Sequence, residues 1–490
     1  MMGTVSFFIL GFACSSLAQT PDVSSKDEIE SRIDRVISGL LPEGDAPKRF
    51  GPKAVLKDRM AHYHTPGVSI AVINRGRIEW ARGFGVKEWG KSDPVSEQTI
   101  FQAGSISKPV FAMAVMRLVQ DGKLDLDEDV NRYLKSWKVP ANGLWQPRVT
   151  LRQLLSHTAG LTVHGFPGYA RTETIPSVVD VLNGRPPANT KRVFVDILPG
   201  SRFRYSGGGT TVAQQLVVDV LGRPFPKIMQ ELVMAPLGMK SSTYEQPLPD
   251  DWADAAATGH PSRNRQVEGG WHVYPEMAAA GLWTTPSDLA RVGLEVQRAL
   301  KGESDRVLDS DKAVAMLTPG IDEKIGIGFF LFGKGKTVRF GHSGADEGFV
   351  ATMTFSKEGG IGAVVMLNSY DGIPLLSEIE RAIAREYDWP GYFPDEAPEK
   401  PETPASETLD RYVGSYVTKS KLVFTIARGG DGLLLKFSNQ PPLELAAESE
   451  TRFSTTAINA QVTFEKNKEG KVTGLLLEQD GTPTAAERGP

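Results

Sequence analysis

Apolar and polar positions divide the chain into segments with strand and helix periodicity. Two strand-like runs, Gly67 to Asn74 and Arg77 to Gly85, flank Arg75-Gly76, a dipeptide typical of a tight hairpin turn. The residues from Pro109 to Gln120 are almost all apolar, which predicts a helix buried on every side. The segment from Asp27 to Leu41 has apolar residues at helical spacing and predicts a further helix.

Later segments continue this alternation between helices and strands. Helical spacing recurs in Leu151 to Ser156, Thr210 to Leu221, Phe225 to Leu232 and Pro286 to Leu300. Strand-like runs return in Gly326 to Phe332, Thr337 to Phe340, Phe349 to Ser356 and Gly362 to Asn368. The order of strands, many helices and then strands again predicts an α+β domain whose sheet is completed from both ends of the segment.

The last part of the chain has a different pattern. A stretch rich in Pro and Glu, residues 391–407, packs poorly and predicts a linker. Residues 408–490 contain short alternating runs separated by Asp431-Gly432, Glu469-Gly470 and Asp480-Gly481. Short strands at regular spacing predict a small antiparallel barrel or sandwich.

The first 18 residues resemble a targeting segment. Val5 to Ala13 is apolar but too short to span a bilayer, and Ser16-Leu17-Ala18 is a small-x-small cleavage site. No Lys or Arg precedes the run, which leaves the true translation start open. A buried N-terminal strand is the alternative. We expect a signal peptide at 1–18 and an exported protein, periplasmic or secreted, with no stable membrane anchor.

Composition excludes several classes of partner and chemistry. The formal net charge is −4 and no basic stripe occurs, so we expect no nucleic-acid partner. Cys14 is the only cysteine and lies in the predicted signal peptide, which excludes disulfides and thiolate metal sites in the mature chain. His62 and His64 precede Pro66 in a loop without an acidic partner, so we expect no metal and no cofactor.

The first candidate catalytic residues lie at the start of the predicted buried helix. Pro109 is tolerated only in the first helical turn, so the helix is expected to start near Ser107. Ser105 then lies at the helix N-terminus, and Lys108 lies on the same side one turn later. Burial favours the neutral form of a lysine amine, which can accept the proton of a serine hydroxyl. Taken alone, Ser-x-x-Lys is a weak signal, since an N-cap serine followed by a surface lysine has the same spacing.

Two further segments strengthen this interpretation. Tyr205-Ser206-Gly207 precedes a predicted helix, and a tyrosine at such a loop edge suits a proton shuttle. His342-Ser343-Gly344 follows a predicted strand and suits an edge strand that offers backbone N–H groups to a cleft. Considered separately, the first is equally compatible with a core-edge tyrosine and the second with a polar turn. His157 fits a loop-anchoring role better than a catalytic base.

These motifs occur in the order found in serine β-lactamase-like proteins. The chain resembles the class C β-lactamase branch, which includes family VIII carboxylesterases, D-aminopeptidases and D-alanyl-D-alanine carboxypeptidases. Thr150 to Leu161 and Ala279 to Leu289 are similar to further conserved segments of that family. The resemblance covers residues 27–390 and implies a β-lactamase/transpeptidase-like domain, with an antiparallel sheet flanked by helices and an all-helical region. Residues 408–490 resemble the lipocalin-like C-terminal barrels of some members.

The resemblance implies a role for each motif residue. Ser105 would be the nucleophile, Lys108 would abstract or orient its proton, and Tyr205 would act as general acid and base. The backbone N–H groups of Ser105 and Ala345 would form the oxyanion hole. The substrate-binding residues would be Gly207, His342, Ser343 and Gly344.

Two departures from the family pattern change the expected substrate. Gly207 stands where this branch usually has asparagine, and His342 stands where it usually has lysine. A neutral imidazole holds a carboxylate less well than a lysine does. We therefore expect a serine hydrolase that cleaves small carboxylic esters or amides through an acyl-enzyme. D-aminopeptidase, D-alanyl-D-alanine carboxypeptidase or β-lactamase activity on D-peptides or β-lactams is the alternative, and a non-catalytic binding protein is a third possibility. The oligomeric state stays open.

Overall fold

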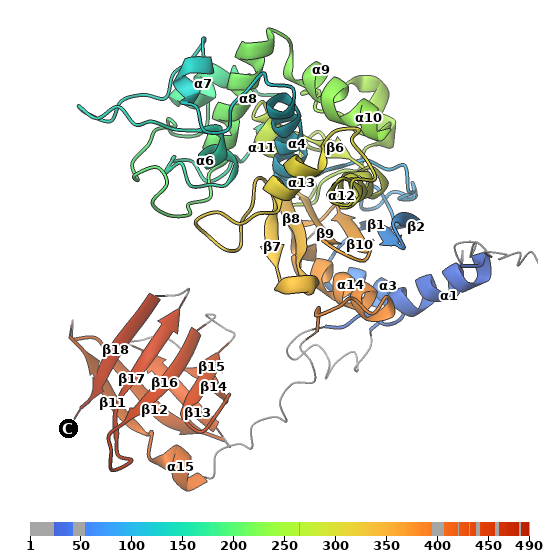
Figure 1. The fold of residues 1–490 in the computed structure, drawn as a ribbon. Helices are drawn as coiled ribbons and strands as arrows, with labels where there is room; N and C mark the ends of the chain where they lie inside the picture. The colour runs from blue at the N-terminus through green and yellow to red at the C-terminus, as the bar shows by residue number, and fades with distance from the viewer. Residues whose placement is uncertain are drawn as a thin grey trace, which may run out of the picture. The chain divides into compact units, whose positions relative to one another are not determined.

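The computed structural model divides into two compact units, Met1–Tyr392 and Phe393–Pro490 (Figure 1). It describes residues 24–42, 54–263, 265–393, 406–419, 421–430, 432–437, 442–455, 460–479 and 482–489. The expected signal peptide at 1–18, most of the expected linker and the dipeptide Asp480-Gly481 lie outside the described residues.

A six-stranded antiparallel sheet forms the centre of the first unit, with strand order β2-β1-β10-β9-β8-β7. Its strands are β1 (Gly67–Asn74), β2 (Arg77–Gly85), β7 (Phe330–Phe332), β8 (Arg339–Asp346), β9 (Phe349–Ser356) and β10 (Gly362–Leu367). β1 pairs with β10, so strands from the two ends of the unit lie side by side, as predicted (Figure 1). The α+β interpretation is therefore confirmed.

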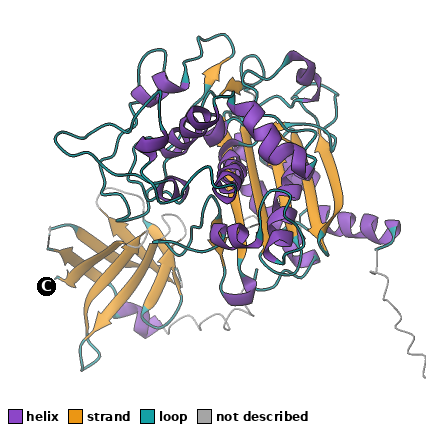
Figure 2. Ribbon diagram, turned by 45° about the horizontal axis from the view of Figure 1, so that its top comes forward, coloured by secondary structure: helices purple, strands orange, loops and turns teal. Residues whose placement is uncertain are grey.

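Helices cover both faces of this sheet (Figure 2). Strand β1, which lies between β2 and β10, is buried on both sides, and this explains why its sequence is a nearly continuous apolar run. Ala71 and Ile73 belong to a core shared with α4 (Ser107–Gln120) and α12 (Pro286–Leu300). Val68, Ile70 and Val72 belong to a second core, shared with α1 (Lys26–Ile37), α3 (Leu56–His62) and α14 (Ile373–Glu386).

The helical region lies between β2 and β7 in the chain. Its α-helices besides α4 and α12 are α5 (Val130–Tyr133), α6 (Leu151–Leu155), α7 (Val178–Asn183), α8 (Gly207–Leu221), α9 (Phe225–Met229), α10 (Ala235–Leu237), α11 (Met277–Ala280) and α13 (Ser310–Met316). The short helices of other types in the unit are η1 (Gly104–Ile106), η2 (Gln230–Met234), η3 (Asp250–Ala255), η4 (Gly335–Thr337) and η5 (Tyr370–Gly372). Two small sheets pair β3 (Phe101–Gln102) with β6 (Trp283–Thr284) and β4 (Tyr169–Ala170) with β5 (His272–Val273).

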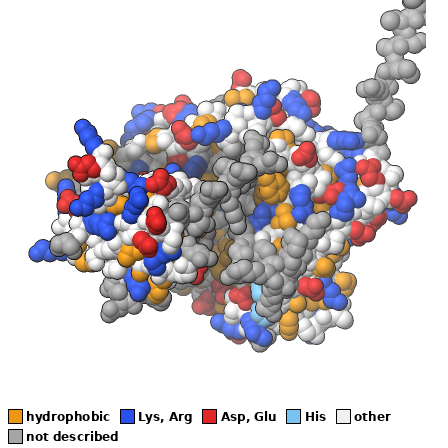
Figure 3. Space-filling view, turned by 90° about the horizontal axis from the view of Figure 1, so that it is seen from below, with side chains coloured by type: hydrophobic (Ala, Val, Ile, Leu, Met, Phe, Trp, Pro, Cys, Tyr) orange, Lys and Arg blue, Asp and Glu red, His pale blue; other side chains and the backbone are white. Residues whose placement is uncertain are grey.

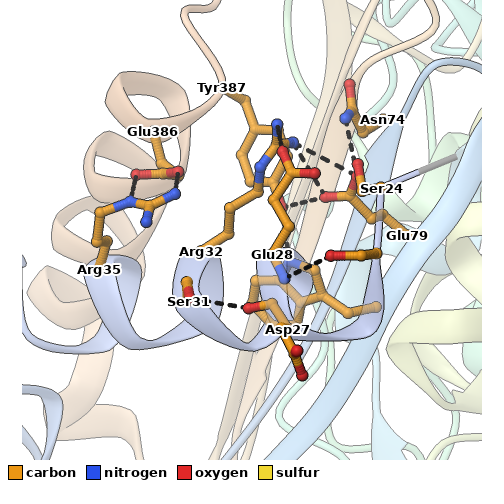
Figure 4. Close-up of polar contacts among 12 residues, drawn as sticks. Ser24, Asp27, Glu28, Ser31, Arg32, Arg35, Asn74, Glu79, Glu386 and Tyr387 are labelled. Atoms are coloured by element: carbon orange, nitrogen blue, oxygen red, sulfur yellow. Dashed lines mark hydrogen bonds and ion pairs between the residues drawn. The ribbon is translucent and has the colours of Figure 1, made fainter. Parts of the chain in front are cut away.

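Ion pairs tie the N-terminal helix α1 to the rest of the unit (Figure 4). The guanidinium of Arg35 donates to both carboxylate oxygens of Glu386 on α14. Arg32 forms an ion pair of 3.4 Å with Glu79 on β2, which also accepts a hydrogen bond from Tyr387. On the face seen in Figure 3, acidic and basic side chains are interspersed. None of the described helices is long and apolar enough to cross a membrane.

The second unit contains α15 (Ser406–Asp410) and a closed eight-stranded antiparallel barrel, β11 to β18 in sequence order. The strands are β11 (Gly414–Thr418), β12 (Val423–Gly429), β13 (Gly432–Phe437), β14 (Leu443–Ala447), β15 (Arg452–Thr455), β16 (Ala460–Lys466), β17 (Val472–Gln479) and β18 (Thr482–Arg488). Its core combines aliphatic and aromatic side chains, and Tyr412 is stacked on Phe464 at a centroid distance of 4.1 Å. The structure therefore shows a closed barrel and not a sandwich.

Three strands differ in their boundaries from the sequence prediction. The strand expected to end at Asn368 ends at Leu367. The segment from Gly326 to Phe332 contributes only Phe330–Phe332 to the sheet. The strand expected at Thr337 starts at Arg339, because Gly335–Thr337 forms a 3₁₀ turn, and it continues to Asp346. The motif His342-Ser343-Gly344 therefore lies within β8 and does not follow it.

Candidate active site

Ser105 lies in the 3₁₀ turn η1, immediately before the buried helix α4. Gly104 opens this turn with φ +52°, and a Cβ on it would lie 2.5 Å from the backbone nitrogen of Ala345. The Ser107 hydroxyl closes the turn by donating to the carbonyl of Gly104 at 2.6 Å. The turn is thereby packed directly against strand β8.

Lys108 contacts Ser105 from the first turn of α4. Its side chain is buried, with 4% exposed, and its Nζ lies 2.9 Å from Ser105 Oγ. The same Nζ donates to the carbonyl of Ala279 on α11 at 2.7 Å. The spacing predicted from Ser-x-x-Lys therefore produces a direct hydroxyl–amine contact, and a distant carbonyl orients the amine.

The ring of Tyr205 lies beside the same amine. Lys108 Nζ is 5.0 Å from the ring centroid, within range of a cation–π contact. The rings of His157 and Phe330 pack on Tyr205 at centroid distances of 4.3 and 6.4 Å. Among the described residues, no hydrogen bond joins the Tyr205 hydroxyl to Ser105 or Lys108. The ring of Tyr205 therefore lies beside Lys108, but its hydroxyl bonds to neither Lys108 nor Ser105.

His157 anchors the loop that carries Tyr205. Its Nδ1 accepts a hydrogen bond of 3.2 Å from the backbone N–H of Ser206. Burial and the nearby Lys108 hold the pKa of His157 well below its usual range, so the imidazole is neutral. This geometry agrees with the loop-anchoring interpretation drawn from the sequence.

The end of β8 is open towards the cleft. Strand β7 pairs only with the first three residues of β8, so residues 342–346 extend beyond it. Asp346 pairs with Phe349 across a two-residue turn and forms the hydrogen-bonded pair of this hairpin. Hydrogen-bonded and free pairs alternate in an antiparallel ladder, so Ala345 belongs to a free pair and its N–H points away from β9.

Gly344 brings this strand end against the Ser105 turn. A Cβ on Gly344 would lie 1.9 Å from the carbonyl oxygen of Ala103 and 3.1 Å from the backbone nitrogen of Ser105. Only a residue without a side chain permits this approach. The backbone N–H groups of Ser105 and Ala345 therefore belong to two directly adjoining segments.

His342 is buried between the strand and the cavity. Its Nδ1 lies 2.6 Å from the carbonyl of Ser343, and its Nε2 has no hydrogen-bond partner among the described residues. Burial and the nearby Lys108 lower the pKa of His342 to about 3. The ring is therefore neutral, with Nδ1 donating and Nε2 a buried acceptor without a partner among the described residues.

Gly207 is placed differently from the other motif residues. It is the first residue of α8, after the N-cap Ser206, and it is not among the residues that line the cavity around Ser105. A Cβ on Gly207 would lie 3.0 Å from the carbonyl of His164 and 3.1 Å from the ring of Phe166, both of which line the cavity. Gly207 therefore lies behind the cavity wall.

The side chains converge on one cavity of about 770 Å³. From the sequence motifs it is lined by Ser105, Lys108, Tyr205, His342, Ser343, Gly344 and Ala345. Most of its remaining lining is apolar, including Phe166, Phe203 and Phe330. Lys108 is the only Lys or Arg among the lining residues. Among the described residues, no group of three or more His, Cys, Asp or Glu could hold a metal ion.

Two buried acids near the site were not identified from the sequence. Asp346 Oδ2 accepts a hydrogen bond of 3.1 Å from the backbone N–H of Gly104, and burial raises the pKa of Asp346 well above its usual range. Glu276, just before α11, is 0% exposed, and burial raises its pKa to about 8. Asp346 closely follows a recognisable motif, whereas no pattern in the sequence marks Glu276.

The fold is that of the β-lactamase type of serine hydrolase. The Beta-lactamase family model matches residues 53–387, and the chain belongs to this family. A second model, a domain of unknown function named DUF3471, matches residues 398–488.

Curated relatives and solved structures agree with this assignment. The chain is 28% identical to esterase EstB of Burkholderia gladioli over 53% of this chain and 68% of that protein. It is 24% identical to penicillin-binding protein 4* of Bacillus subtilis over 88% of this chain and 97% of that protein. The structural match to D-amino acid amidase from Ochrobactrum anthropi SV3 covers 74% of this chain and 98% of the amidase chain, with a TM-score of 0.56 and 20% identity.

Proposed function

We propose that this protein is an exported serine hydrolase that cleaves small carboxylic esters or amides through an acyl-enzyme on Ser105. The observation that carries the proposal is the 2.9 Å contact between Ser105 Oγ and Lys108 Nζ at the floor of the cavity. A serine hydroxyl becomes a useful nucleophile when a neighbouring base accepts its proton, and Lys108 is within reach to do so.

The first half of the reaction forms the acyl-enzyme. Ser105 Oγ attacks the substrate carbonyl carbon while its proton passes to Lys108 in its uncharged amine form, and the carbonyl oxygen becomes an oxyanion. The backbone N–H groups of Ser105 and Ala345 stabilise that charge, and such donors contribute about 10²- to 10³-fold each in comparable enzymes. Collapse of the tetrahedral intermediate breaks the bond to the alcohol or amine, which leaves with a proton supplied through Tyr205.

The second half returns the enzyme to its starting state. Water attacks the acyl-enzyme, Tyr205 or Lys108 accepts its proton, and Ser105 Oγ leaves and is reprotonated. Tyr205 reaches this role by a rotation that brings its hydroxyl towards Ser105, since its ring already lies beside Lys108. Catalytic hydrogen bonds often tighten only when substrate is present.

The electrostatics of the cavity favour substrates without a carboxylate. Lys108 is the only Lys or Arg that lines the cavity, and it is engaged with Ser105 and Ala279. His342 is neutral and presents an acceptor at Nε2, so it does not attract an anion. The likeness to an esterase, EstB, supports the same substrate class.

The unpartnered Nε2 of His342 also favours a second candidate, cleavage of D-amino acid amides or D-peptides. A free amino group beside the scissile carbonyl donates N–H bonds and suits such an acceptor when a rotation of the imidazole exposes Nε2 to the cavity. The D-amino acid amidase has the same fold, and that likeness adds a reason to test this substrate class.

The experiment is intact-protein mass spectrometry of wild type beside Ser105→Ala. Each protein is mixed briefly with p-nitrophenyl acetate, with a D-amino acid p-nitroanilide, or with a fluorophosphonate probe. The proposal predicts an adduct on wild type that is absent from a well-folded Ser105→Ala protein. Equal ester turnover by both proteins, or no fluorophosphonate labelling of folded wild type, would refute it. Release of p-nitroaniline without ester turnover would select the second candidate.

A further inference from the structure

The cavity does not end at Ser105 but continues along the outer face of the sheet to helix α14. Val350 and Thr352 of β9, and Ile373 and Leu376 of α14, line the same cavity as Ser105. We call the part bounded by β8, β9 and α14 the apolar arm. Ser343 and Ala345 project from the face of β8 opposite to Gly344, so the arm meets the Ser105 side of the cavity at the open edge of residues 342–346. A group attached to the scissile carbonyl can extend into the arm around that edge.

The floor of the apolar arm follows from the register of β8 and β9. Ser343 pairs with Thr352, and Ala345 pairs with Val350. Cross-strand partners project to the same face of a sheet, so these four side chains form one surface. They are small or β-branched, and those of Ser343 and Ala345 are exposed. Val350 is buried and Thr352 is half-buried, so the open part of the floor lies at Ser343 and Ala345.

The walls come from α14 and β7. Ile373, Leu376, Ser377 and Glu380 all line the cavity, and their spacing of i, i+3, i+4 and i+7 places them on one side of α14. The opposite wall includes Phe332 of β7. Ile373 and Phe332 are each 45% exposed, so the arm offers apolar surface that a ligand can cover.

The acidic side chain at the far end of the apolar arm is hydrogen-bonded. Glu380 accepts hydrogen bonds from Thr354 Oγ1 at 3.2 Å and from the hydroxyl of Tyr392 at 3.1 Å. Burial also raises the pKa of Glu380 above its usual range, which favours its neutral form. None of the described residues of β8, β9 and α14 that line the arm is Lys or Arg, so the arm suits an uncharged, extended apolar group.

We propose that the apolar arm binds an uncharged alkyl or aryl group of the substrate, on the acyl or the alcohol side of the scissile bond. This inference rests on the proposed function, because it takes Ser105 as the point where the substrate is held. Each methylene that enters the arm raises kcat/KM about three- to fourfold, the ratio expected for burial of one CH₂.

The test compares two substrate series on four proteins. In one series the acyl chain of a p-nitrophenyl ester grows from acetate to octanoate; in the other the alcohol of an acetate ester grows from methyl to octyl. The proteins are wild type, Ile373→Asp, Thr352→Phe and the control Val314→Asp. Val314 lies on α13, is also 45% exposed and does not line this cavity.

For wild type and the control, we expect kcat/KM to rise with chain length in one series, and that series identifies the side that enters the arm. Ile373→Asp places a carboxylate in the arm and Thr352→Phe fills it, so each should lower the octyl-to-short-chain ratio by about tenfold or more. Thermal melts establish that all four proteins are folded. A flat chain-length profile in wild type, or an equal rise in all four, would overturn the proposal.

A binding measurement separates this inference from the proposed function. If wild type cleaves no ester, calorimetry on Ser105→Ala compares N-octylacetamide with N-methylacetamide, without any need for turnover. Tighter binding of the octyl compound that is lost in Ser105→Ala/Ile373→Asp supports the apolar arm even when the proposed chemistry fails. Equal binding of the two amides overturns it.

Discussion

Substitution of Gly344 by alanine tests whether the close approach of β8 to the Ser105 turn creates the oxyanion site. The added Cβ would lie 1.9 Å from the carbonyl oxygen of Ala103, whereas real Cβ contacts are rarely shorter than about 3 Å. The turn and the strand must separate by about 1 Å. The backbone donors of Ser105 and Ala345 lie on opposite sides of that contact, so their separation changes with it.

The expected loss follows from that displacement. A misplacement of about 1 Å costs about 10²-fold in rate, and loss of one oxyanion donor costs about 10²- to 10³-fold. We therefore expect Gly344→Ala to lower kcat for p-nitrophenyl acetate by about 10²-fold or more. Overpacking should also lower the free energy of unfolding, by about 1–3 kcal/mol.

Gly320→Ala is the matched control, because nothing lies within 4 Å of the Cβ it would add and its backbone conformation admits any residue. Steady-state kinetics and thermal unfolding are measured on both variants and on wild type. Near-wild-type kcat in a folded Gly344→Ala protein would refute the reasoning, as would equal losses in both variants.

Two further predictions concern the buried acids. Asp346→Asn keeps an acceptor for the N–H of Gly104, so its kcat should stay within about threefold of wild type, whereas Asp346→Leu should lose about tenfold or more at similar KM; equal kinetics in the two variants would contradict this. For Glu276, burial raises the pKa from 4.5 in the unfolded chain to about 8 in the folded one. The folded state therefore binds the proton more tightly, and the stabilising effect is complete below the unfolded pKa and is lost as pH rises through the folded one. Glu276→Gln should remove this contribution, up to about 1.4 kcal/mol per pH unit, so thermal unfolding from pH 5 to pH 8 should show a smaller loss of stability than in wild type. Parallel pH profiles for wild type and Glu276→Gln would count against it.

Local sequence patterns were sufficient to predict the boundaries of several long, strongly periodic elements. The strands β1 and β2 and helix α12 have the predicted boundaries, because a turn dipeptide or a proline marks an end of each. The start of α4 at Ser107 follows from the position of Pro109. Each of these signals depends on residues only a few positions apart.

Elements whose stability comes from distant partners were missed. The helix α14 was not predicted, although it lies against β9 and β10, and Pro374 lies in its first turn. Of the barrel strands, β11, β14, β15 and β18 were not identified individually. Their pairing depends on closure of the barrel, in which β11 meets β18 at the other end of the unit.

The sequence by itself determined the nucleophile motif, the Tyr205 and His342 segments, and the family they resemble. Only the tertiary structure placed the carbonyl of Ala279 on Lys108 and the carboxyl group of Asp346 on Gly104, contacts that span 171 and 242 residues of the chain. It also placed Gly207 behind the cavity wall and opened the apolar arm beside α14. The physical reason is that a helical or strand period records only which side of an element is buried, whereas the partner on that side is chosen by packing across the whole fold.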